Sequence, residues 1–257
     1  MVSAFLFGCN NHHSPTGRGQ TLLFSSAEMQ QLGEASFKQM KAQQPISKNK
    51  ALTQYVNCIA MRITAQIPND KGPWELVLFE SPQVNAFALP GGYIGVYTGL
   101  LKVAKTPDQL AAVIGHEVAH VLANHGNEQV SRAQIKGVGL KIANIALDLG
   151  DVSNRDLYMA ALGLGADVGY TLPFGREQES EADVLGLKLM AQAGFNPKAS
   201  ISLWQNMSKA SGDAPFELLS THPSNKNRIT ELQQHQAEVM PYYLASKKQN
   251  MRVCSVH

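Results

Sequence analysis

The chain has 257 residues, of which 44% are hydrophobic, and a formal net charge of +2 from 22 basic and 20 acidic residues. This length and composition predict one large globular domain, and the balanced charge gives no reason to expect nucleic acid as a partner. No run of 18 or more apolar residues occurs, so no conventional membrane span is predicted.

The first residues resemble the end of a bacterial lipoprotein signal. A short apolar run closes with Leu-Phe-Gly-Cys at positions 6–9, which predicts lipidation of Cys9. The alternative is an apolar terminus that carries no lipid. Residues 10–24 are predicted to form a flexible tether, so that 1–24 would comprise a signal remnant and a tether.

The two other cysteines form a candidate pair. If Cys9 carries lipid, Cys58 and Cys254 remain as an even number, and an oxidising periplasm would allow a disulfide between the tail and an early helix. Neither lies in a CxxC motif. The sequence leaves open whether the two meet.

Two helices and a small sheet are predicted before residue 100. Ser25-Ser-Ala-Glu28 is a capping box that begins a helix to about Lys41, and a second helix fits Lys50 to Ile67. The hydrophobic period then changes and predicts three strands, the last two joined in a hairpin by Pro90-Gly-Gly. These strands are residues 74–80, 85–89 and 93–97.

The next predicted helix contains the candidate metal-binding and catalytic residues. A Thr-Pro pair at 106–107 begins it, and it is predicted to end near residue 124. His116 and His120 lie one turn apart on one face, where two imidazoles can share a metal ion. Glu117 lies to one side, where its carboxylate can reach a water on that metal.

This spacing is the HExxH pattern of zinc hydrolases. The alternative is that these are ordinary polar residues on a helix. However, the helix is otherwise apolar nearly all round, so three ionisable groups there need a compensating partner, and a cation supplies it. His125 would fall about 180° from His116 on the same helix and point away. The third ligand must come from elsewhere.

The segment after this helix is ambiguous. Helices are predicted near 127–148 and 153–163, followed by a glycine-rich segment that leads to Pro173. This segment is compatible with a mobile lid and equally with closely packed helices.

A helix from Arg176 supplies the missing ligand. Glu179 and Asp183 share a face that is otherwise small or apolar, whereas Glu177 and Glu181 share the opposite, polar face. An inward carboxylate pair needs a cation or donors. Glu179 is therefore the predicted third ligand, and Asp183 would accept a hydrogen bond from a ligating histidine. The alternative, an acidic first turn, accounts for Glu177 but not for the inward pair.

Four motifs in this order resemble metallopeptidase family 48, a family of gluzincin zinc peptidases, over residues 45–232. The resemblance implies an α+β, mainly helical zincin-like domain with a small β-sheet beside the active-site cleft. It also implies a zinc endopeptidase with one Zn²⁺ per chain, held by His116, His120 and Glu179, with Glu117 as the base. The motifs are His116-Glu-Val-Ala-His120, Glu179-Ser-Glu-Ala-Asp183, Asn85-Ala-Phe-Ala-Leu-Pro-Gly-Gly92 and Thr221-His-Pro-Ser224 through Arg228-Ile229.

Without membrane spans, the chain is similar to the soluble, lipid-anchored branch of that family. The resemblance implies work in envelope quality control on unfolded or extended polypeptides, in the periplasm of a Gram-negative bacterium, anchored to the outer or inner membrane. The peptidase domain is expected to occupy residues 25–240 and a peripheral tail 241–257.

Two later residues have predicted roles at the site. His222, in a loop at 218–223, is a candidate donor to the oxyanion; alternatively it occupies the open zinc position and holds the enzyme latent, or it is a loop histidine bonded to backbone. Arg228 is expected to pair with an acidic group of the site that the sequence does not identify.

Substrate binding is placed on the strand that contains Asn85, Ala86, Phe87 and Ala88. An extended strand near the metal can pair with the main chain of an unfolded peptide. The alternative is an interior strand with both edges occupied.

The remaining elements are helical. Gly194 ends the third-ligand helix, Asn196-Pro197 begins the next, which runs to about Ala210, and Ser224 caps a last helix to about Met240.

Three functions are compatible with these patterns. They are an active zinc endopeptidase, a latent, chaperone-like binder of unfolded chains, and an interaction module with a purely structural zinc site. Glu117 argues against the third, because a structural site does not need it.

Overall fold

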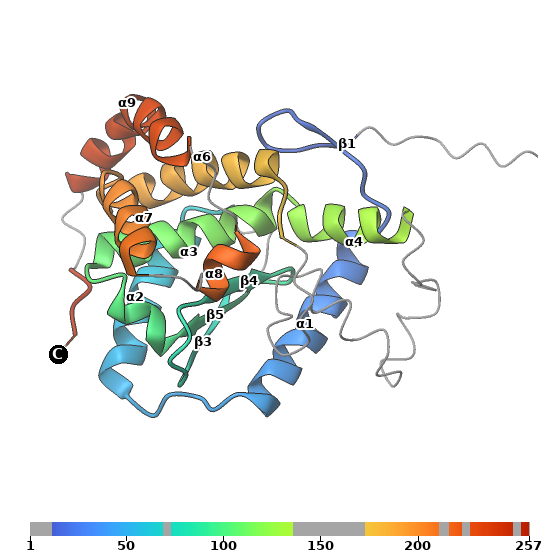
Figure 1. Cartoon of the computed structure of the whole chain (residues 1–257), viewed down its shortest axis with the longest axis horizontal. Helices are drawn as coiled ribbons and strands as arrows, with labels where there is room; N and C mark the ends of the chain where they lie inside the picture. The colour runs from blue at the N-terminus through green and yellow to red at the C-terminus, as the bar shows by residue number, and fades with distance from the viewer. Residues whose placement is uncertain are drawn as a thin grey trace, which may run out of the picture.

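Helix α3 (Pro107–Leu122) lies at the centre of the fold, with a small sheet on one side and helices α6 and α9 on the other (Figure 1). The computed structural model describes residues 12–68, 73–135, 173–210, 216–222, 227–248 and 253–256. Mainly helical with small sheets, it confirms the predicted α+β class. Thr106 caps α3 by accepting a hydrogen bond from the Gln109 N–H, as predicted.

The sheet beneath α3 has three strands in the order β3-β5-β4. β4 (Ala86–Leu89) and β5 (Tyr93–Tyr97) form the predicted antiparallel hairpin, whereas β3 (Glu75–Phe79) runs parallel to β5. The hairpin turn places Gly91 and Gly92 at φ of 94° and 88°, a region in which glycine has no steric penalty. β4 is therefore an edge strand, and it is the strand that contacts α3.

The first two helices match their predicted positions. α1 (Ser26–Gln43) has the predicted capping box between Ser25 and Glu28, and α2 (Lys50–Thr64) buries its apolar stripe against α3. Cys58 of α2 forms a disulfide with Cys254, which confirms that the two cysteines meet. Cys254 is only 3% exposed, whereas Val253 and Val256 are 76% and 53% exposed, so within the predicted tail the disulfide attaches Cys254 itself to the core.

On the other face of α3 lies α6 (Arg176–Gln192), followed by α7 (Ala199–Ala210), α8 (Glu217–Thr221) and α9 (Arg228–Lys247). α9 begins at residue 228 and continues past the predicted end at residue 240; Ser224 lies outside the described residues. None of the described helices is both long and apolar enough to cross a bilayer.

Helices α3 and α6 cross where two glycines face each other. A Cβ atom on Gly115 would lie 2.9 Å from the carbonyl oxygen of Gly186, and a Cβ atom on Gly186 would lie 2.8 Å from the backbone nitrogen of His116. Only glycine allows two helix backbones to approach so closely. The crossing brings the first turns of α6 to the metal-binding face of α3.

Helix α3 ends two residues before its predicted end. Asn124 adopts a positive φ of 55°, which stops the helix, and α4 (His125–Ile135) begins directly after it. His125 is thus not on the same helix as His116. As predicted, it is not among the clustered donors of the described residues, but its side chain turns toward His120 rather than away from it. The rest of the helix predicted over 127–148, the helix at 153–163 and the glycine-rich segment up to residue 172 lie outside the described residues.

Residues 12–24, which we call the N-terminal strap, are not the predicted flexible tether. They contain a two-stranded hairpin, β1 (His12–His13) and β2 (Gly19–Gln20), and bond to α4 and to the end of α3. The Gln20 side chain donates to the Ala123 carbonyl over 2.6 Å, and the Leu23 N–H donates to Ser131 over 2.9 Å. The first of these bonds satisfies a backbone carbonyl at the end of α3 that has no partner within the helix. Cys9 lies outside the described residues.

Candidate metal centre

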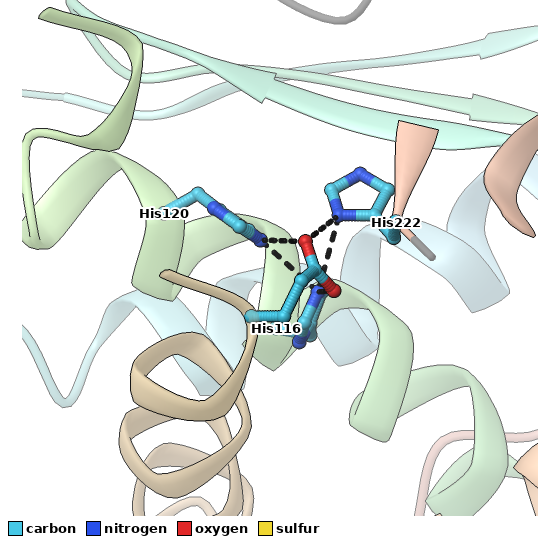
Figure 2. Close-up of side chains that lie close together, drawn as sticks. His116, His120 and His222 are labelled. Atoms are coloured by element: carbon cyan, nitrogen blue, oxygen red, sulfur yellow. Dashed lines mark hydrogen bonds and ion pairs between the residues drawn. The ribbon is translucent and has the colours of Figure 1, made fainter. Parts of the chain in front are cut away.

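Four buried side chains meet between α3, α6 and the end of α8. His116 and His120 come from successive turns of α3, Glu179 from the first turn of α6, and His222 directly follows α8. One potential ligand atom from each lies within 4.8 Å of the others. Figure 2 shows the three histidines pointing toward one carboxylate.

The spacing of these atoms fits a tetrahedral metal ion. With bonds of about 2.0 Å, two ligand atoms of a tetrahedral zinc lie ~3.3 Å apart. The Nε2 atoms of His116 and His120 are 3.1 Å apart; the first lies 3.4 Å from Glu179 Oε2 and the second 3.4 Å from Glu179 Oε1. Two imidazoles and a carboxylate are also a donor set that zinc prefers, so these residues fit the ion that the sequence predicts.

The electrostatics of the cluster favour a cation at the same place. Although burial opposes it, hydrogen bonds with Asp183 and Glu179 raise the pKa of His116 to about 9. Burial also opposes the ionisation of Glu179, but the surrounding histidines hold the pKa of its carboxyl well below the usual value. Burial holds the pKa of His120 well below the usual value, so this ring is neutral and can ligate.

Asp183 and Arg228 lie behind the cluster. Asp183 Oδ1 is 2.9 Å from His116 Nδ1, so its partner is one of the two histidines that are predicted to ligate. The Arg228 guanidinium, whose side chain is 1% exposed, donates to Asp183 over 2.7 Å and to Glu179 over 3.1 Å, and it stacks on the Trp204 ring. These carboxylates are the acidic groups that the sequence could not identify. Arg228 therefore compensates charge that one metal ion would not neutralise.

Glu117 lies beside the four donors without being one of them. Its Oε1 atom is buried and has no hydrogen-bond partner in the part of the chain that the structure describes. Burial raises the pKa of this carboxyl. A buried carboxylate oxygen without a partner is costly, and it marks a position where a proton donor such as water would bind.

His222 reaches the cluster from a different element than predicted. Residues 217–221 form the short helix α8, not a loop, and His222 is its C-terminal capping residue. Its Nδ1 atom lies 2.9 Å from Glu179 Oε1 and 3.3 Å from His116 Nε2, while Nε2 is 3.5 Å from Glu117 Oε1. Its ring is thus within reach of both the donor set and the base.

His125 and Glu181 also lie at the site, although the sequence pattern predicts that both point away from it. His125 is completely buried, and its Nδ1 atom lies 2.9 Å from His120 Nδ1. Glu181, expected on the polar face of its helix, is 5% exposed and lies 3.1 Å from His125 Nε2. The signal that could have found them is Asn124, a residue tolerant of positive φ that marks a helix end before His125.

A cavity of about 240 Å³ adjoins His120. Its walls come from α1, the hairpin turn and the end of α3, and they include Ala88 of β4. The other predicted substrate-strand residues do not line it. Phe87 packs into an aromatic cluster with Phe79 and Tyr97, Ala86 is buried, and the Asn85 side chain bonds the adjacent Ala86 N–H. Of the four predicted residues, Ala88 is therefore the one that lines the cavity together with His120.

The sequence also matches known proteins. The chain is 38% identical over 184 residues to mitochondrial metalloendopeptidase OMA1 of Schizosaccharomyces pombe, covering 71% of this chain and 52% of that protein. It is 32% identical to the mitochondrial metalloendopeptidase OMA1 of Danio rerio, covering 90% of this chain and 51% of that protein. It is 28% identical to the beta-barrel assembly-enhancing protease of Yersinia pestis, covering 91% of this chain and 48% of that protein. The chain thus spans about half the length of these relatives.

The family model for peptidase family M48 matches residues 47–236. That range contains both helices that supply the histidine pair and Glu179, the edge strand β4 and the residue that follows α8. Since the match covers most of the chain and the whole donor cluster, the chain belongs to peptidase family M48.

Proposed function

We propose that this chain is a zinc-dependent endopeptidase, with His116, His120 and Glu179 holding one Zn²⁺. The observation that carries the proposal is the spacing of the donors: zinc ligands are expected ~3.3 Å apart, the Nε2 atoms of the two histidines are 3.1 Å apart, and each lies 3.4 Å from a different oxygen of the Glu179 carboxylate. The unpartnered Oε1 atom of Glu117 beside them supports a catalytic rather than a structural centre.

Zinc, when bound there, would supply Lewis acidity that activates a water and polarises the scissile carbonyl. Glu117 then accepts the proton of the attacking water at its unpartnered oxygen and passes it to the leaving amine. Asp183 accepts the Nδ1–H of His116 and so keeps Nε2 free to ligate, while Arg228 holds Asp183 and Glu179 in place.

We place an extended peptide along the outer edge of β4. Within the described residues this strand pairs with β5 alone, and the register directs the backbone polar groups of Ala86 and Ala88 to the outer edge. Because the Ala86 N–H already donates to the Asn85 side chain, we place the main-chain pairing at Ala88. Main-chain pairing depends little on sequence, so unfolded or extended polypeptides are the proposed substrates. The cavity beside Ala88 and His120 would take one substrate side chain.

A latent resting state is the second candidate, and the position of His222 favours it. With Nδ1 at 2.9 Å from Glu179 and 3.3 Å from His116, His222 lies where a fourth ligand would bind. In that state it would block the position that water needs, and the chain would bind unfolded polypeptides without cutting them. Once displaced, the same ring could donate to the oxyanion.

We also propose an oxidising compartment, the periplasm, with lipid on Cys9 as the anchor. The Cys58–Cys254 disulfide supports such a compartment, because disulfides do not persist in a reducing cytosol. Labelled palmitate should enter the full-length precursor and not its Cys9→Ser variant. Equal labelling of both would exclude this anchor.

The function is tested with Glu117→Gln. This variant should keep its zinc and lose cleavage of an unfolded protein by at least about 100-fold, because the base is absent while the ligands remain. Lys188→Gln, on an exposed position of α6, serves as the control. Full cleavage by Glu117→Gln would refute the role of Glu117 as base. If His222→Ala cleaves faster than the parent chain, the latent state is supported; slower cleavage favours a donor role.

A further inference from the structure

The two candidate ligand histidines are supported in different ways. His116 has a carboxylate, Asp183, at 2.9 Å from its Nδ1 atom. The Nδ1 atom of His120 instead faces another imidazole, His125, at 2.9 Å, and the far nitrogen of that imidazole lies 3.1 Å from Glu181. All three side chains of this second chain of contacts are buried.

Only one arrangement of protons satisfies these contacts. A ligating His120 presents the lone pair of Nε2, so its proton is on Nδ1 and is donated to His125 Nδ1. His125 then carries its own proton on Nε2 and donates it to the Glu181 carboxylate. With both tautomers reversed, a lone pair of His125 would face the carboxylate, which is repulsive.

The N-terminal strap holds the end of this chain of contacts. Thr16 Oγ1 donates to one Glu181 oxygen over 2.6 Å, and Arg18 Nε donates to the other over 3.0 Å. The same guanidinium makes a bidentate pair with Glu128 of α4, at 2.9 and 2.8 Å. Since both oxygens of Glu181 are occupied by donors from the strap, its orientation toward His125 is fixed.

We propose that His125 and Glu181 are positioning residues that set the tautomer and ring orientation of His120, and that the N-terminal strap is part of this support. The inference rests on the proposed zinc site. The strap then acts at the metal centre although it lies outside residues 47–236, which the family model matches. Loss of the hydrogen bonds from Thr16 and Arg18 to Glu181 would weaken metal binding although the ligand residues themselves stay unchanged.

The test compares two substitutions of His125 in the full chain. Glutamine offers an acceptor toward His120 and a donor toward Glu181, the same polarity as the required tautomer, whereas leucine offers neither. Zinc affinity is measured by competition with a chelating dye. His125→Leu should raise the zinc Kd by about 10- to 100-fold, the range for loss of a ligand's hydrogen-bond partner, and His125→Gln should stay within a few-fold of the parent.

Glu181→Gln gives a second route that does not depend on His125→Leu folding. It should also raise the zinc Kd by about 10-fold, because one oxygen that accepts from the strap or from His125 becomes an NH₂ group. Glu177→Gln, exposed on the same helix, and His235→Leu, on α9, are matched controls and should keep the parent Kd. Because the contacts act in series, His125→Leu with Glu181→Gln should weaken binding no more than the stronger single variant.

Thermal unfolding of the metal-free variants separates positioning from general damage. A rise in Kd with a metal-free unfolding midpoint similar to that of His125→Gln supports positioning. An unchanged Kd in both His125→Leu and Glu181→Gln, or equal losses in His125→Leu and His125→Gln, overturns the inference while leaving the zinc site intact. If the parent chain itself fails to bind zinc, the proposed function fails instead.

Discussion

The glycine crossing between α3 and α6 predicts that Gly186→Ala will impair the metal centre more than the fold. A Cβ atom there would lie 2.8 Å from the His116 nitrogen and 2.9 Å from the Gly115 carbonyl carbon, both backbone atoms that cannot rotate away. Ordinary contact needs about 3.5 Å, so the helices must separate by about 0.7 Å. Glu179 is on one helix and the histidine pair on the other, and metal sites tolerate only about 0.2 Å in bond length.

The stability cost is expected to be smaller. Overpacking costs about 1–3 kcal/mol, but alanine in place of glycine in a helix returns up to about 1 kcal/mol. The free energy of unfolding of the metal-free chain should therefore fall by about 2 kcal/mol or less, whereas the zinc Kd should rise at least about 10-fold. Urea unfolding and dye competition measure the two quantities.

Gly33→Ala provides the matched control. It also adds a Cβ against backbone, at the Pro90 carbonyl, but at the contact between α1 and the hairpin turn rather than between α3 and α6. It should destabilise the chain and leave the zinc Kd unchanged. If Gly186→Ala loses stability but keeps the parent Kd, the crossing does not set the ligand spacing.

Three further changes test other contacts. Arg228→Met removes the permanently charged partner of two buried carboxylates and leaves them only their histidine contacts, so the free energy of unfolding in urea should fall by about 3–5 kcal/mol; no change would refute this compensation. Cys254→Ser opens a disulfide between residues 196 positions apart and should cost about 2–5 kcal/mol, a loss that reductant should reproduce in the parent chain alone. Although burial opposes it, Arg18 holds the pKa of Glu128 below its ordinary 4.5, so this stabilisation is complete above that pH and is lost as the pH falls further. The protection factors of the strap amides, which correct for the intrinsic pH dependence of hydrogen exchange, should therefore fall below about pH 4.5, and in Arg18→Gln they should be low at every pH.

Local patterns were sufficient for most of the longer helices, for the β4–β5 hairpin and for the candidate metal ligands, but not for the strap hairpin or for α8. The capping box at Ser25, the alternation over 85–97 and the Thr-Pro start of α3 each depend on neighbouring residues, and the structure has all three features where they are predicted. The histidine pair and Glu179 follow from helical spacing on two helices, because a helix fixes which side chains share a face.

What the sequence could not supply are the contacts made between distant segments. Three such contacts depend on how elements pack, which no local period encodes. They are the parallel pairing of β3 with β5, the ion pair between Arg18 of the strap and Glu181 of α6, and the ion pair between Arg228 and Asp183. A single residue in a left-handed conformation, Asn124, ends α3 and turns His125 inward, reversing a prediction that assumed a continuous helix.

Sequence alone therefore determined which residues can ligate and which can act as base, since those are properties of side-chain chemistry at helical spacing. The sequence also predicted Asp183 as one group that orients a ligating histidine, whereas the tertiary structure decided the support of His120. Glu181 appears on the polar face of its own helix, and donors from other segments, namely Thr16, Arg18 and His125, make its burial favourable. A carboxylate is buried where donors from elsewhere in the chain compensate its lost hydration, and that condition is set by the fold.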